Sequence, residues 1–93
     1  MSNFIKLTEI RENTQRWPSN TKRYKLAEII VNSANISVIR CGAHFKKEIK
    51  SYKGWPDGLD ERIYITEVLL NQQNVYVIGD IENIAKKIGG YSE

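Results

Sequence analysis

The chain has 93 residues, a formal net charge of +3 and a single cysteine, and these properties exclude several classes of protein. A chain of this length forms one domain, residues 1–93, with a modest core, so we expect its subunits to share surface in a homo-oligomer. One cysteine excludes an internal disulfide framework and a cysteine-based zinc site, and no apolar run is long enough to cross a bilayer. The N-terminus is too polar for a signal peptide, so a cytoplasmic location is expected.

The first predicted strand covers residues 4–11, where apolar and polar residues nearly alternate and Ile5 and Leu7 fall on one face. Residues 12–25 follow without apolar periodicity and contain Pro18, which predicts an irregular loop. Residues 26–32 and 36–41 are rich in β-branched residues and predict two further strands. Because Asn35 lies between them and tolerates the backbone of tight turns, we expect these two strands to form a hairpin.

A second long connection covers residues 42–61 and ends in the turn signal "WPDG". Within it, residues 43–52 are compatible with a short helix, because Phe45 and Ile49 are four residues apart and would share a face. Residues 62–70 and 75–79 then predict a second hairpin around "NQQN".

The last predicted element is a helix within residues 80–90. Its apolar positions fall on one helical stripe, Asp80 suits the N-cap, and Gly89 suits the position after the helix. The stripe that should pack on the sheet consists of Ile81, Ile84, Ala85 and Ile88. The predicted fold class is therefore α+β and β-rich: a curled antiparallel sheet of about five strands, made of two hairpins plus an N-terminal strand, with one C-terminal helix.

Two segments of the chain echo each other. "IIVNSANISVI" at residues 29–39 and "VLLNQQNVYVI" at residues 68–78 carry two asparagines at matching places, and a Trp-Pro pair precedes each. Internal duplication would explain the echo, and so would two strand pairs that draw on the same small set of strand and turn residues. In either case we assign the echo to the scaffold and look for function beside the Trp-Pro pairs.

Taken in order, "FIKLTEI", "AEIIVNSANISVI", "IYITEVLL" and "VYVIGDIENIAKKI" resemble the small flagellar FlbD-type proteins and similar short proteins of phage genomes. The shared pattern is a lysine-bearing first strand, a strand that ends in Asn, an Ile-rich partner strand, and a strand that runs into an acidic helix start. The chain departs from this family in two long connections, residues 12–25 and 42–61, where the family has short ones. The resemblance therefore implies the scaffold, while the two expansions are particular to this chain.

Little in the sequence nominates a reaction. Cys41 and His44 are three residues apart, but no third group that would orient a catalytic pair is evident, so we expect Cys41 to be a buried strand residue and His44 a loop residue that faces a ligand. Asp57, Asp60 and Glu61 do not match a calcium-loop pattern and indicate a polar turn. "IGG" follows a helix, whereas a phosphate-binding loop precedes one. We expect no enzymatic activity, no cofactor and no metal.

The two expansions interleave positive side chains with aromatic rings, a combination that suits a ligand with both phosphates and ring systems. A second interpretation remains open, in which the lysines are only solvated and the tryptophans cover the core. The candidate ligand-binding residues are Arg16, Trp17, Lys22, Arg23, Tyr24, Arg40, His44, Phe45, Lys46, Lys47, Tyr52 and Trp55.

The leading hypothesis is a non-enzymatic binding protein for an anionic, ring-containing small molecule. In its most concrete form, a phage protein would sequester a nucleotide signal and so counter a bacterial defence. One alternative is a module that binds single-stranded nucleic acid. Another is a protein–protein adaptor of flagellar type, in which Trp17 and Trp55 anchor an interface.

Overall fold

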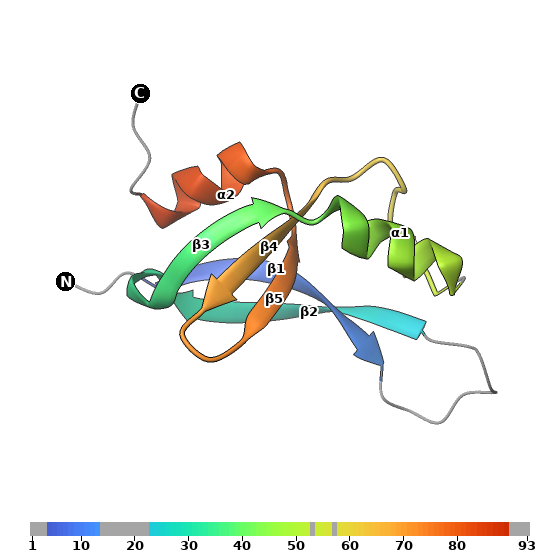
Figure 1. Cartoon of the computed structure of the whole chain (residues 1–93), viewed down its shortest axis with the longest axis horizontal. Coiled ribbons are helices and arrows are strands. Elements are labelled where there is room, and N and C mark those ends of the chain that lie inside the picture. Colours follow the sequence, from blue (N-terminus) through green and yellow to red (C-terminus); the bar gives the residue numbers. More distant parts are fainter. Residues whose placement is uncertain (1–3, 14–22, 53, 57, 90–93) are drawn as a thin grey trace.

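The computed structural model describes residues 4–13, 23–52, 54–56 and 58–89 and confirms the predicted fold class (Figure 1). Five antiparallel strands form one sheet in the order β2-β1-β5-β4-β3. The elements are β1 (Phe4–Asn13), β2 (Arg23–Asn32), the 3-10 helix η1 (Ser33–Asn35), β3 (Ile36–Cys41), α1 (Ala43–Ser51), β4 (Ile65–Leu70), β5 (Asn74–Ile78) and α2 (Ile81–Ile88). The helix considered within residues 43–52 is thus present as α1, beside the predicted C-terminal helix.

The predicted hairpin between residues 26–32 and 36–41 is wrong. β2 pairs along its whole length with β1, from Phe4 opposite Asn32 to Asn13 opposite Arg23, whereas β3 pairs with β4. The reason lies in η1, where the Asn32 side chain accepts the N–H of Ala34 at 3.0 Å. This capped 3-10 turn is a corner that carries the chain from one edge strand of the sheet to the other.

The first connection is also shorter than expected, because β1 extends to Asn13 and β2 begins at Arg23. Tyr24 explains the extension of β2. Its side chain is buried, and its N–H donates to the carbonyl of Gly54 at 3.2 Å. Contacts with the second connection therefore fix a strand that local composition does not predict.

The corner requires the sheet to curl, because three residues join its two edge strands. Inside the curl, Leu7, Val68 and Val77 pack with Ile84 of α2. On the outer face, α1 packs Ile49 against a second apolar cluster that includes Ile10, Tyr24 and Ile65. The two helices thus cover opposite faces of the sheet, and every residue from Ile65 to Val68 in β4 is buried.

The C-terminal helix begins and ends as its sequence predicts. The Asp80 side chain accepts the N–H of Asn83 at 2.8 Å, and Gly89 closes the helix in the left-handed conformation. Ile81 does not pack on the sheet as the predicted stripe requires. It is 40% exposed, whereas Ile84 is 1% exposed. Ile81 opens the helix where it leaves the sheet, and Ile84, almost one turn later, enters the core.

Cys41 and His44 also differ from their predicted environments. Cys41 is exposed rather than buried, because it ends β3, which is an edge strand of the sheet. His44 lies in the first turn of α1 and not in a loop, and its side chain is exposed.

The two isoleucines of α2 provide a matched test of this packing. We expect Ile84→Ala to lower the free energy of unfolding by about 2–5 kcal/mol, because it removes a fully buried side chain from the core. Ile81→Ala makes the same chemical change in the same helix and should cost less than about 1 kcal/mol. Urea unfolding of both variants measures the difference, and equal losses would contradict the packing described here.

Candidate functional site

The outer face of the sheet carries a row of polar side chains on three neighbouring strands. Arg40 of β3 lies opposite Glu67 of β4, and Glu67 lies opposite Tyr76 of β5. Residues directly opposite each other in an antiparallel sheet point to the same face, so the strand register itself brings the three side chains together.

Glu67 is the centre of this row, with 5% of its side chain exposed. Its carboxylate accepts hydrogen bonds from Arg40 Nε at 2.9 Å, Asn74 Nδ2 at 3.0 Å and the Tyr76 hydroxyl at 3.4 Å. A buried carboxylate is costly unless it is paired and hydrogen-bonded, and these three donors satisfy it. Glu67 therefore acts as a fixed anchor for the groups around it.

Arg40 is oriented by this anchor but remains accessible, since 59% of its side chain is exposed. The hydrogen bond to Glu67 uses Nε, and the two Nη groups make no hydrogen bond to another described residue. A guanidinium held in this way presents a planar pair of donors, which matches the oxygens of a phosphate or carboxylate.

His44 lies next to the row on α1, and its Nε2 is 3.2 Å from the Tyr76 hydroxyl oxygen. The Tyr76 hydroxyl has one proton and donates it to the carboxylate of Glu67, which can only accept. His44 Nε2 is then the donor to Tyr76. The ring itself is exposed and meets Tyr76 edge-on, with 5.7 Å between the ring centroids.

Aromatic rings connect this polar row to the core. Phe45 stacks on Tyr76 with centroids 3.9 Å apart, and Tyr24 meets Phe45 edge-on at 5.6 Å. Burial, followed by the charge of Glu67, raises the pKa of Tyr76, so this hydroxyl remains protonated at neutral pH. Burial, with a smaller effect of Glu48, raises the pKa of Tyr24 to about 12.

The N-terminus of α1 adds backbone donors beside Arg40 and His44. Gly42 is its N-cap and provides no side-chain cap, and the first turn contains no acidic residue. The N–H of Gly42 donates to the carbonyl of Ile65, and the N–H groups of Phe45 and Lys46 donate to the carbonyl of Gly42. The intervening N–H groups of Ala43 and His44 lie at the positive end of the helix dipole, which favours an anion.

Other predicted ligand-binding residues have structural roles. Lys46 Nζ donates to the carbonyl of Ile63 at 2.9 Å, and Trp55 Nε1 donates to the carbonyl of Leu59 at 2.7 Å. Tyr24 is buried, and Tyr52 is half-buried just after α1.

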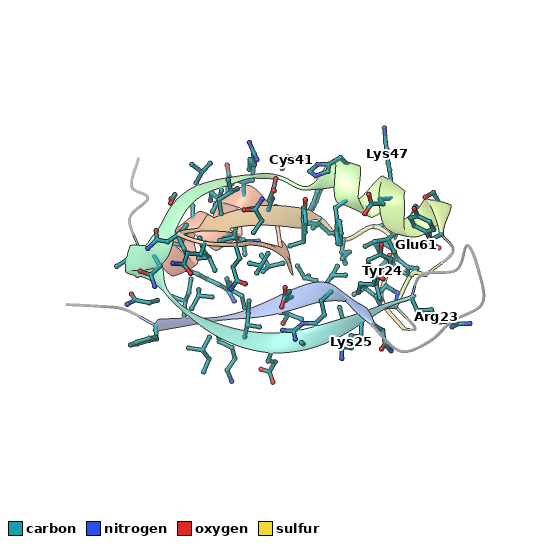
Figure 2. The ribbon with its side chains drawn as sticks, turned by 60° about the horizontal axis from the view of Figure 1, so that its bottom comes forward. Arg23, Tyr24, Lys25, Cys41, Lys47 and Glu61 are labelled. Atoms are coloured by element: carbon teal, nitrogen blue, oxygen red, sulfur yellow. The ribbon has the colours of Figure 1, made fainter. Side chains whose placement is uncertain are left out.

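The cations of the two connections do not form one cluster among the described residues. Lys47 points away from the sheet on α1, whereas Arg23 and Lys25 lie on β2 across the molecule from it (Figure 2). Arg16, Trp17 and Lys22 lie outside the described residues. Among the described residues, the structure thus gathers Arg40, His44 and Phe45 beside Glu67 and Tyr76 and places Arg23 away from them.

Two of the acidic residues ahead of β4, Asp60 and Glu61, pair with nearby cations, and the third, Asp57, lies outside the described residues. Asp60 accepts two hydrogen bonds from the Arg62 guanidinium and one from its backbone N–H, which together lower the pKa of Asp60. Glu61 pairs with Lys50 at 3.1 Å. Within the described ranges, His, Cys, Asp and Glu side chains do not gather in a group that could hold a metal ion. Neither α-helix in this part of the chain has the length and apolar character needed to cross a membrane.

Sequence reasoning missed Glu67, Asn74 and Tyr76, which complete the site. One signal was available, because "ITEVLL" places a glutamate within an apolar strand and a buried charge requires partners. The identity of those partners depends on strand register, which the sequence does not reveal.

With this geometry established, comparison with known proteins adds no assignment. The chain matches no protein-family model, and no curated protein or solved structure is significantly similar to it.

The raised pKa of Tyr24 predicts how stability changes at high pH. The protonated Tyr24 hydroxyl contributes its full stabilisation below its unfolded pKa of 10.0. This contribution is lost as the pH rises toward the folded pKa of about 12. We expect Tyr24→Phe to reduce the loss of stability between pH 10 and pH 11.5 by about 1–2 kcal/mol. Denaturant unfolding across this range measures the effect. Tyr64→Phe, at an exposed side chain, is the control, and an identical response of both variants would contradict the burial of the Tyr24 hydroxyl.

Proposed function

We propose that this chain is a binding protein for an anionic, nucleotide-like ligand, which contacts the face formed by Arg40, His44 and Lys47. The observation that carries the proposal is the Arg40 guanidinium, held by the buried Glu67 at 2.9 Å with its Nη groups uncommitted. A preoriented guanidinium loses little side-chain entropy on binding, and it lies beside the uncapped N-terminus of α1.

The remaining groups on α1 suit the rest of such a ligand. Lys47 is exposed and three residues after His44, so the two side chains share one helix face. The exposed His44 ring offers a planar surface for a heterocycle, while Arg40 and Lys47 offer positive charge for its phosphate groups.

The polar row supports binding rather than catalysis. A general base must be reachable by the substrate proton, but the carboxylate of Glu67 is buried and already accepts three hydrogen bonds. The raised pKa of Tyr76 likewise favours a protonated hydroxyl that remains bonded within the row. Sequestration of a nucleotide signal, as a phage protein that counters a bacterial defence would perform, is the concrete form of this proposal.

The two alternative functions receive less support from the described residues. Binding of single-stranded nucleic acid would use rings that stack on successive bases, but Tyr24 is buried and Phe45 already stacks on Tyr76. The adaptor hypothesis assigns an interface to Trp55, whose indole N–H is bonded to the carbonyl of Leu59. Its other anchor, Trp17, lies outside the described residues.

Calorimetry with adenosine monophosphate, guanosine diphosphate and a cyclic dinucleotide tests the proposal. We expect at least one of them to bind, and we expect Arg40→Ala to weaken that binding roughly 10- to 100-fold, because it removes a charge-assisted hydrogen bond. The absence of binding heat for all three would contradict the proposed function.

Two further variants separate binding from stability. Arg40→Ala also removes a partner of the buried Glu67 and can therefore lower stability. Lys47→Ala breaks no hydrogen bond or ion pair between described residues, so it should weaken binding by roughly 3- to 10-fold without loss of stability. Lys87→Ala in α2 removes the same charge far along the chain from the site and should leave affinity unchanged. Equal effects of Lys47→Ala and Lys87→Ala would indicate attraction by overall charge instead of a site.

A further inference from the structure

A hollow at the corner of the sheet has no role in the proposed anion site. It has a volume of about 600 Å³ and is formed by the end of β2, η1 and the turn between β4 and β5. Its lining residues are Ile30, Val31, Asn32, Asn35, Leu70, Asn71, Gln72 and Gln73. These turns belong to the two echoing segments, so folding brings three of their four matching asparagines, Asn32, Asn35 and Asn71, to one place.

The chemistry of this lining is unusual because five of its eight residues carry a carboxamide and none carries a charge. The other three, Ile30, Val31 and Leu70, provide apolar surface. Such a site favours a neutral ligand with apolar faces and a polar edge over an ion.

The hydrogen bonds within the hollow leave some carboxamide groups available. Asn71 Nδ2 donates to Asn35 Oδ1 at 3.4 Å, and Asn32 Oδ1 is occupied by the N–H of Ala34. Neither the Asn35 amide nitrogen nor the Asn71 amide oxygen makes a hydrogen bond to another described residue. The carboxamides of the hollow thus offer both a donor and an acceptor, the two groups with which an Asn or Gln side chain reads the edge of a nucleobase.

We propose that this corner groove is a second binding site, and that it takes a neutral nucleoside through its base. The planar faces of a base suit the aliphatic side chains, and its donor and acceptor edge suits the paired carboxamides. A neighbouring hollow of about 470 Å³ shares Ile30, Val31, Leu70 and Gln73 with the first and extends to Glu9 and Arg11. This second hollow gives room for the sugar.

A free sugar and a peptide are poorer matches to the same lining. A sugar ring carries hydroxyl groups around its edge and commonly stacks its apolar face on an aromatic side chain, but none of the lining residues is aromatic. A peptide strand would bind chiefly through backbone hydrogen bonds along a sheet edge. Here five of the eight lining residues carry a carboxamide side chain instead.

The test is a titration of the full chain with adenosine, guanosine, cytidine and uridine, followed through the side-chain NH₂ signals of Asn and Gln in ¹⁵N-resolved NMR spectra. We expect at least one nucleoside to shift the signals of Asn35, Asn71 and Gln73 in a saturable way, whereas glucose does not. The proposal is overturned if no nucleoside shifts these signals, if the shifts occur only around α1, or if glucose produces the same shifts.

Matched substitutions then locate the site. Asn71→Leu should weaken nucleoside binding at least roughly 10-fold, because it removes both hydrogen-bonding atoms of that carboxamide. Gln73→Leu serves as a second variant if Asn71→Leu fails to fold, since Gln73 accepts the N–H of Leu70 through its backbone carbonyl and not its side chain. Asn83→Leu in α2 is the control and should leave binding unchanged. A response to Arg40→Ala equal to that of Asn71→Leu would assign the nucleoside to the anion site and overturn a separate groove.

Discussion

The capped corner at Ser33–Asn35 is the constraint on which the rest of the structure depends. By carrying the chain from β2 to β3 in three residues, it joins the two edge strands of the sheet and requires the sheet to curl. The curl creates an inner face, which α2 fills with Ile84, and an outer face, which α1 covers with Ile49. A hairpin at the same place would have made β2 and β3 neighbours in the sheet. The sheet would then not need to curl, and the two apolar clusters would not be required on opposite faces.

The same constraint places the polar groups. Since β3 cannot pair with β2, it pairs with β4, and that register sets Arg40 opposite Glu67 and Glu67 opposite Tyr76. The chain then enters α1 three residues after Arg40, which places an uncapped helix start and His44 beside the guanidinium. The proposed anion site is thus a local consequence of how the sheet is ordered, and it uses groups from β3, α1, β4 and β5.

The sequence predicts local structure well and long-range pairing poorly, for a physical reason. Asp80 and Gly89 identify the ends of α2 because capping is a local interaction, and the alternation in residues 4–11 identifies β1 because burial on one face of a strand has a period of two. In contrast, the residues that join β2 and β3 suit a hairpin turn and a 3-10 corner about equally, and only tertiary contacts decide between them.

Of the candidate site, Arg40, His44 and Phe45 were identifiable from charge and ring content. Glu67 and Tyr76 required the register. The hydrogen bonds of Trp55 and Lys46 to backbone carbonyls are likewise invisible in a sequence.

The order of the strands can be measured directly through contacts between backbone protons in NMR spectra. The structure requires cross-strand contacts of Leu7 with Ile29 and of Ile39 with Val68, because these residues are register partners. A ladder of contacts between residues 26–32 and 36–41 would instead show a β2–β3 hairpin. That result would contradict the corner, and with it the placement of both proposed sites.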